Sequence, residues 1–115
     1  MAKDDYHVIV YQILSYLYNC LKKGLKVNEK NLEWNNSKYF DIPHEYWCYI
    51  IINMYNEELI TGITLTKAWG QQYPLISDLQ NCQITPRGIE YLTDNSFMMK
   101  AKNFFKVVKE ITPFI

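Results

Sequence analysis

The chain has 115 residues, of which 49% are hydrophobic and 16% aromatic, so it is long enough to bury the core of one domain. Its 12 Lys and Arg residues balance 12 Asp and Glu residues, which excludes the strongly basic composition typical of nucleic-acid-binding domains. The three cysteines are far apart and form no CxxC pair, so we expect free thiols in a reducing compartment.

The N-terminus and the longest apolar stretch bear on where the protein acts. Asp4 and Asp5 make the N-terminus acidic, so no signal peptide is predicted. The stretch from Val8 to Leu21 is interrupted by three polar side chains and is shorter than the roughly 18 residues of a membrane span. We therefore expect a cytoplasmic protein that makes no use of a membrane.

The first predicted element is a helix from about Asp4 to Lys23. Polar residues recur in it at helical spacing and define one narrow stripe, which consists of Gln12, Ser15, Asn19, Lys22 and Lys23. The remaining, apolar positions form a face wide enough to contact neighbours on two sides. Gly24 ends the helix directly after two lysines, which suit the negative end of its dipole.

Two shorter helices are predicted next. Asn28 caps a helix that runs to about Trp34 and turns Leu32 inward. A third helix begins near Pro43, because proline is favoured in the first turn, and ends near Glu58. Its inward positions follow the i, i+3, i+4, i+7 rule and are Trp47, Ile50, Ile51 and Met54. We expect these side chains to be buried against Ile9, Ile13 and Leu17 of the first helix and against Leu92.

The spacing of apolar residues then changes from helical to alternating. The β-branched stretch from Leu59 to Thr66 predicts a strand, and residues 82–85 predict a second one. Residues 67–80 have no clear period and contain Gly70 and Pro74, so we expect a long connection between the two strands.

Two helices complete the chain. Thr85 caps the first of them, with Pro86 in its first position and Ile89 and Leu92 facing inward. Ser96 is expected to cap the last helix, whose apolar stripe consists of Phe97, Ala101, Phe104, Val108 and Ile111.

This order of elements predicts a mainly α (α+β) fold. Three helices followed by a hairpin with a long tip are typical of a winged helix-turn-helix, in which the hairpin is the wing and further helices follow at the C-terminus. We assign residues 1–95 to the winged-helix domain and residues 96–115 to a C-terminal helix that packs on the domain or forms a dimer interface.

Three segments between Phe40 and Leu92 carry a resemblance to a known family. They are Phe40–Pro43 ahead of the third helix, Glu58–Ile63 at the start of the wing, and Ile84–Leu92 after it. These segments resemble the YjcQ family of small bacterial and phage-associated winged-helix proteins. The resemblance implies the fold and a DNA-binding or regulatory role, and it brings no set of functional residues with it.

The sequence contains no pattern typical of catalysis or of metal binding. GxSxG, HExxH, P-loop and GxGxxG motifs do not occur, and His7 and His44 stand in different elements. Neighbouring carboxylates such as Glu57 and Glu58 point apart on a helix, so they are poor acid–base partners. We expect no enzyme, no metal or other cofactor and no small-molecule substrate.

The outward face of the third helix and the wing carry candidate contacts to double-stranded DNA. In a winged helix the third helix enters the major groove and the wing contacts the flanking backbone. Asn53 is a candidate to read adenine, because Asn pairs bidentately with its major-groove edge. The candidate set is His44, Tyr49, Asn53, Lys67, Trp69 and Arg87. It predicts a transcription regulator associated with phage or another mobile element.

The charge distribution opposes DNA binding and leaves an alternative open. Between Asn28 and Asp94 four basic residues face nine acidic ones, a net charge of −5 on the elements that would meet DNA. The lysines that would compensate lie near the two ends of the sequence: Lys3, Lys22, Lys23, Lys26, Lys100, Lys102, Lys106 and Lys109. A dimer could bring these lysines to a duplex. The alternative is a protein–protein interaction module on the same scaffold, without DNA binding.

The last helix is the candidate dimer interface. It lies beyond the minimal winged helix, and its apolar residues cover more than one face, with Met98, Met99 and Phe105 off the main stripe. Exposed Met and Phe side chains suit an adaptable interface, so we expect a homodimer. Its candidate residues are Phe97, Met98, Phe104, Phe105 and Val108. Alternatively, the helix closes over the first helix.

Overall fold

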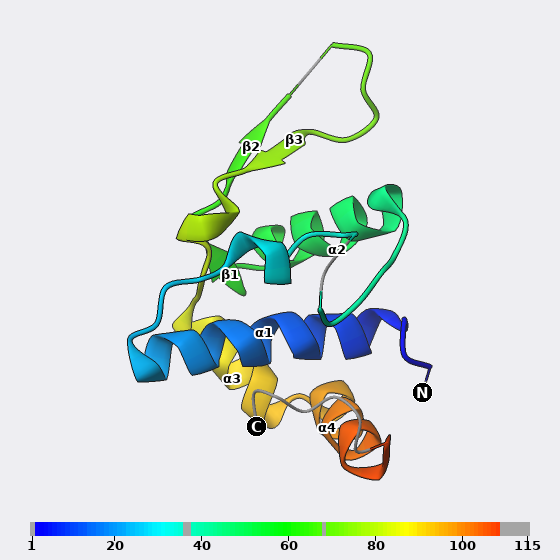
Figure 1. Ribbon diagram of the computed structural model, residues 1–115, viewed down its shortest axis with the longest axis vertical. Helices are drawn as coiled ribbons and strands as arrows, with labels where there is room; N and C mark the ends of the chain where they lie inside the picture. Colours follow the sequence, from blue (N-terminus) through cyan, green and yellow to red (C-terminus); the bar gives the residue numbers. More distant parts are fainter. Residues whose placement is uncertain (1, 36–37, 68, 109–115) are drawn as a thin grey trace.

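A long helix, α1 (Tyr6–Lys23), runs through the middle of the molecule (Figure 1). Helix α2 (His44–Asn56) and the hairpin lie on one side of it, and α3 (Pro86–Asp94) and α4 (Ser96–Val108) lie on the other. The computed structural model describes residues 2–35, 38–67 and 69–108, with side chains as far as Lys106. This part of the chain is a mixed α+β structure of four α-helices and two small antiparallel sheets.

Helix α1 is buried on nearly every side, because elements pack against it from both directions. It ends before Gly24, as predicted. The predicted polar stripe is wrong in its first half, since Gln12 and Ser15 are buried. The Gln12 Nε2 atom donates to the Tyr39 carbonyl at 3.1 Å, so the loop ahead of α2 covers this polar group.

The second predicted helix is only a single 3-10 turn, η1 (Glu29–Asn31). Its cap is as predicted, because the Asn28 side chain accepts from the Lys30 amide at 3.1 Å. Leu32 is buried, and its carbonyl accepts from Trp47 Nε1 at 2.7 Å. This hydrogen bond connects the η1 segment to α2, although the helix predicted as far as Trp34 does not form.

The inward face predicted for α2 is confirmed. Its four residues are Trp47, Ile50, Ile51 and Met54, and they lie in one core cluster with Ile9, Ile13 and Leu17 of α1. Leu92 packs against this cluster from α3. None of the four is more than 4% exposed. The side of α2 that remains open to solvent is therefore well defined.

The single strand predicted from Leu59 to Thr66 is divided into two. Strand β1 (Ile60–Thr61) pairs antiparallel with β4 (Gln83–Ile84), and β2 (Thr64–Thr66) pairs antiparallel with β3 (Leu75–Ser77). The break falls at Gly62, where a Cβ atom would lie 1.9 Å from the Asn81 carbonyl oxygen of the second 3-10 turn, η2 (Leu79–Asn81).

Strand β3 lies inside the segment predicted as a plain connection, and that prediction is wrong. Its three residues are too few to show a period, and they are ordered by pairing with β2, as in the register of Ile76 opposite Leu65. The hairpin built by β2 and β3 extends away from the helices (Figure 1).

Helices α3 and α4 differ in how well their starts are predicted. The predicted cap of α3 is confirmed, because Thr85 Oγ1 accepts from the Gly88 amide at 2.9 Å. The cap predicted for α4 is wrong. Asn95, and not Ser96, lies in extended backbone, and its Oδ1 accepts from the amides of Phe97 and Met98 at 2.9 and 3.3 Å.

Helix α4 packs against α1 and α3 with a face that shares Ala101 with the predicted stripe but is turned from it toward Met98 and Phe105. Met98, Ala101 and Phe105 are buried, and the Phe105 ring stacks on Tyr11 with centroids 5.7 Å apart. The expected exposure of Met98 and Phe105 is therefore wrong, and neither side chain is available to a partner. Phe97 and Met99 are 43% and 44% exposed, and Phe104 is half-buried. The Val108 side chain and Ile111 lie outside the described residues.

Candidate interaction surfaces

The outer face of α2 carries three of the residues predicted to contact DNA. His44 and Tyr49 are exposed, and Asn53 is half-buried. The Asn53 Nδ2 atom donates to the Tyr49 carbonyl at 2.7 Å, so the amide is turned back on its own helix. An Asn side chain reads adenine with its amide NH2 and its amide oxygen, and in this conformation the NH2 group is already bonded to the helix.

His44 belongs to an aromatic cluster beside a buried thiol. Its ring centroid lies 5.2 Å from that of Trp34 and 5.9 Å from that of Trp47, and its Nε2 is 3.6 Å from Cys48 Sγ. Burial, together with the nearby Glu45 carboxylate, raises the pKa of the Cys48 thiol. Cys48 is thus a neutral packing group. In the described part of the chain, no three His, Cys, Asp or Glu residues are placed to hold a metal ion.

The other three predicted DNA contacts lie away from the outer face of α2, two of them in the hairpin and one on α3. Lys67 and the fully exposed Trp69 lie in the connection between β2 and β3. Arg87 lies in the first turn of α3, where its guanidinium is 4.0 Å from the Glu58 carboxylate. The structure therefore divides the six candidate residues among three places.

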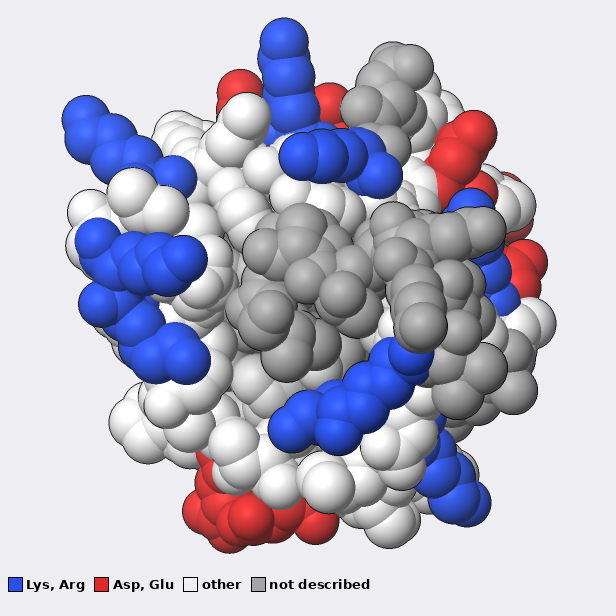
Figure 2. Space-filling view, turned by 60° about the horizontal axis from the view of Figure 1, so that its bottom comes forward, with Lys and Arg blue, Asp and Glu red and all other residues white. Residues whose placement is uncertain are grey.

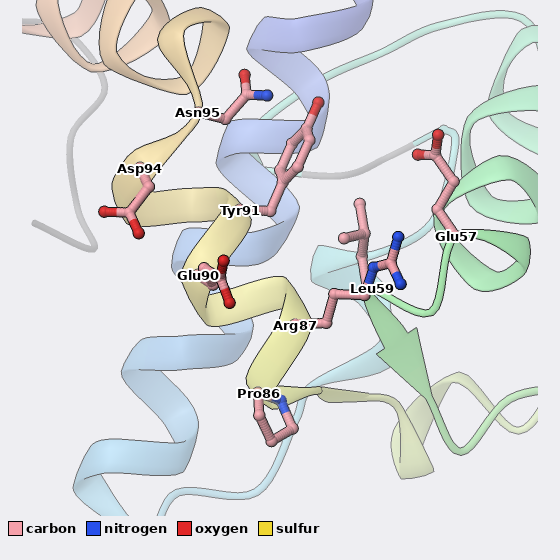
Figure 3. Close-up of a pocket in the computed structure, with 8 residues that line it drawn as sticks. All are labelled: Glu57, Leu59, Pro86, Arg87, Glu90, Tyr91, Asp94 and Asn95. Atoms are coloured by element: carbon pink, nitrogen blue, oxygen red, sulfur yellow. The ribbon is translucent and has the colours of Figure 1, made fainter.

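The sequence gives no direct sign of a depression that borders the end of α2. It is a groove of about 700 Å³ between the end of α2 and α3, called the acidic groove below. Figure 3 shows Arg87, Glu90, Tyr91 and Asp94 along α3, with Glu57 across from them at the end of α2. The remaining lining residues are Leu59, Pro86 and Asn95.

The acidic groove has an excess of negative charge. Glu57, Glu90 and Asp94 have no ion-pair partner among the described residues, whereas Arg87 is paired with Glu58. The last turns of α2 and α3 contain no basic residue, so the negative ends of both helix dipoles add to the same potential. A positively charged group would be attracted to this surface.

Tyrosine rings stand beside the acidic groove. Tyr6 and Tyr49 meet edge to face with centroids 6.0 Å apart. Burial, followed by the nearby Glu57 carboxylate and Tyr91, raises the pKa of Tyr6 to about 12. Burial and then Glu57 also raise the pKa of Tyr91. Both phenols are therefore neutral at physiological pH, and they offer hydroxyl groups and ring faces to a ligand.

A second groove of about 590 Å³ continues this surface around the Arg87–Glu58 pair. Pro86 and Arg87 line both grooves, and Tyr55, Asn56 and Thr61 extend the second one along the end of α2 and β1. The two grooves thus adjoin each other, and together with the exposed outer residues of α2 they are called the acidic face below.

Lysines gather on a different part of the molecule. Figure 2 shows lysine side chains spread over the face turned toward the viewer, on the side of α1 that α3 and α4 cover. Lys22 near the end of α1 and Lys102 on α4 line one groove of about 370 Å³, called the lysine groove below. Lysines from the two ends of the sequence therefore meet within one chain, without the dimer that the sequence suggested.

The two kinds of surface lie on opposite sides of α3. Arg87, Glu90, Tyr91 and Asp94 follow helical spacing and line the acidic groove, whereas Leu92 and Thr93 line the lysine groove. This polar stripe at i, i+3, i+4 and i+7 is the signal in the sequence that could have located the acidic side of α3.

These features define a small mixed α+β protein. The chain matches the family described as YjcQ protein over residues 11–111, and it therefore belongs to this family. The predicted resemblance is confirmed. No curated protein and no solved structure gives a significant match. None of the helices in the described ranges is long and apolar enough to cross a membrane.

Proposed function

We propose that this chain is a non-enzymatic protein–protein interaction module built on a winged-helix scaffold. In this assignment α1, η1 and α2 are the three helices of the winged helix, and the β2–β3 hairpin is its wing. The order of these elements and the antiparallel hairpin support the assignment.

One observation carries the choice of protein over DNA as the partner. The face that a winged helix turns toward DNA presents exposed carboxylates and tyrosines, namely Glu45, Tyr49, Tyr55, Glu57 and Glu58. Phosphates would be repelled by these carboxylates, and phosphate contacts supply most non-specific affinity for DNA. Exposed tyrosines are instead enriched in protein interfaces, and the excess of negative charge favours a partner with basic side chains.

A photo-crosslinking amino acid at position 49 tests this proposal in the organism that encodes the protein. We expect one discrete protein adduct from position 49 and none from the exposed position 23 at the end of α1. The purified partner should bind the wild type and bind the Glu45→Lys, Glu57→Lys double variant at least about 10-fold more weakly. Absence of an adduct at position 49, combined with tight binding of genomic duplexes at physiological salt, would refute the proposal.

DNA binding is the second candidate function, because the side of α1 that carries α4, called the lysine face below, offers a positive surface of its own around Lys22 and Lys102. In that case the duplex would lie on the side of α1 that carries α4, and not on the outer face of α2. The salt dependence of DNA binding by lysine variants separates the two candidates.

The homodimer through α4 is a further proposal, and it now depends on fewer residues. Phe97 and Met99 are its exposed apolar side chains, and Phe104 is half-buried. We expect light scattering at high micromolar concentration to give twice the monomer mass, and Met99→Lys to restore the monomer because it places a charge in the contact. A monomer mass for the wild type would exclude this dimer.

A further inference from the structure

We propose that the lysine groove binds a small organic anion with an apolar body, in addition to any protein bound at the acidic face. The groove lies between α1, α3 and α4, and its volume of about 370 Å³ is within the range of small-molecule sites. It is lined by Tyr11, Ser15, Tyr18, Asn19, Lys22, Leu92, Thr93, Met99 and Lys102.

The charge of the groove selects an anion. Lys22 and Lys102 are its charged side chains, no carboxylate is among the described residues that line it, and neither lysine forms an ion pair with another described residue. The Lys22 ammonium lies 4.3 Å from the centroid of the Tyr18 ring, which holds it at the rim of the groove. A negatively charged head group would therefore meet two ammonium groups that no internal carboxylate neutralises.

The lower part of the groove has a mixed character that suits a ligand with two chemical parts. Tyr11 and Ser15 are buried, and their hydroxyl groups supply the polar component of the lining. Leu92 and the exposed Met99 supply apolar surface from α3 and α4. An apolar body against these two side chains would remove them from water while the head group stays between the lysines.

A titration followed by amide NMR shifts tests this inference with octanoate as the probe. We expect saturable shifts in α1 around Lys22 and in α4 around Lys102. Octanol lacks the charge and acetate lacks the apolar body, so each should bind at least about 10-fold more weakly than octanoate. Equal affinity for octanoate and acetate, or shifts spread over all lysines, would overturn the inference.

Matched lysine variants provide the control. Lys22→Gln with Lys102→Gln should weaken octanoate binding at least about 10-fold, because both ammonium groups that would contact the carboxylate are lost. Lys23→Gln with Lys26→Gln removes the same net charge at exposed positions outside the groove and should leave the affinity within about twofold. Equal weakening in both pairs would mean that octanoate responds only to overall charge. Thermal unfolding of each variant verifies that it is folded.

Discussion

Gly88 determines how closely α3 approaches the rest of the molecule. A Cβ atom at this position would lie 2.2 Å from the Leu59 carbonyl oxygen and 2.8 Å from Ile84 Cγ1. Its amide also donates to the Thr85 side chain that caps α3. Because Leu59 lines the acidic groove together with residues of α3, this close approach lies at the groove itself.

Gly88→Ala is therefore predicted to destabilise the protein. Alanine has the better helix propensity by about 1 kcal/mol, but the clash involves a backbone oxygen that cannot move freely. We expect a net loss of about 1–3 kcal/mol in the free energy of unfolding, measured with urea. Gly70→Ala is the control, because nothing lies within 4 Å of its Cβ and only its positive φ is strained. A Gly88→Ala protein at least as stable as the wild type would contradict this account.

His7 makes the stability sensitive to pH. Its Nδ1 atom is buried without a hydrogen-bond partner among the described residues, and its ring stacks on Phe97 with centroids 4.2 Å apart. Burial lowers the pKa of His7 below 6.5, against a smaller opposite effect of Asp5. The unfolded chain therefore binds the proton more readily, and stability is lost as the pH falls through 6.5 toward the lowered pKa.

His7→Phe should remove this contribution to the pH dependence. The phenyl ring keeps the stack on Phe97 but cannot take up a proton. We expect the wild type to lose more unfolding free energy than the variant between pH 7.5 and pH 5.5, as followed by urea titration at both pH values. Equal losses in the two proteins would show that His7 is not the responsible group.

At the scale of elements, Met98 and not Met99 anchors α4 in the core. Met98 is fully buried under α4, whereas Met99 is 44% exposed. We expect Met98→Ala to lower the free energy of unfolding by about 2–5 kcal/mol, because it leaves a cavity in the core. Met99→Ala should change it by less than about 0.5 kcal/mol. Urea unfolding of the two variants measures both values, and similar losses would mean that α4 faces the core with a different side.

The helices could be predicted from the sequence because their signals are local. Periodicity identifies the inward face of α2, and the cap at Thr85 identifies the start of α3. The rotation of α4 about its axis was missed, since both Met98 and Phe97 belong to plausible apolar stripes and only packing on α1 decides between them. Strand β3 was missed because its partner strand, and not its own composition, orders it.

The binding surfaces could be predicted only in part, because they depend on side-chain geometry and on contacts between distant segments. Tyr49 lies exposed on the outer face of α2, as expected, but the turn of the Asn53 amide toward its own helix depends on side-chain geometry. The acidic groove joins Glu57 to Glu90, and the lysine groove joins Lys22 to Lys102. Each pair is distant in the sequence, so the pattern along the chain does not reveal that its members are neighbours.

At the scale of the whole molecule, the zero net charge conceals two surfaces of opposite sign. Carboxylates surround the end of α2 and the outer side of α3, and lysines occupy the side of α1 that bears α4 (Figure 2). A polyanion would thus be repelled from the acidic face and attracted to the lysine face. The direction from which DNA approaches is therefore a direct test of how the protein uses its scaffold.

We expect random duplex DNA to bind very weakly at physiological salt and, at low salt, to bind through the lysines. Each phosphate contact contributes about 0.9 to the slope of log affinity against log salt, so Lys102→Ala with Lys106→Ala should reduce this slope by up to about two. Asn53→Ala should leave the slope unchanged, because the Asn53 amide bonds to Tyr49 and carries no charge.

The wing lysine decides between the two modes of DNA binding. Lys67 lies at the end of β2, where the wing of a winged helix would contact the DNA backbone. If Lys67→Ala reduces the salt slope by about one while the α4 lysine variant leaves it unchanged, DNA meets α2 and the wing, and the preference for a protein partner is wrong. If the α4 lysines alone carry the slope, DNA binding is confined to the lysine face, and the acidic face stays open to a protein partner.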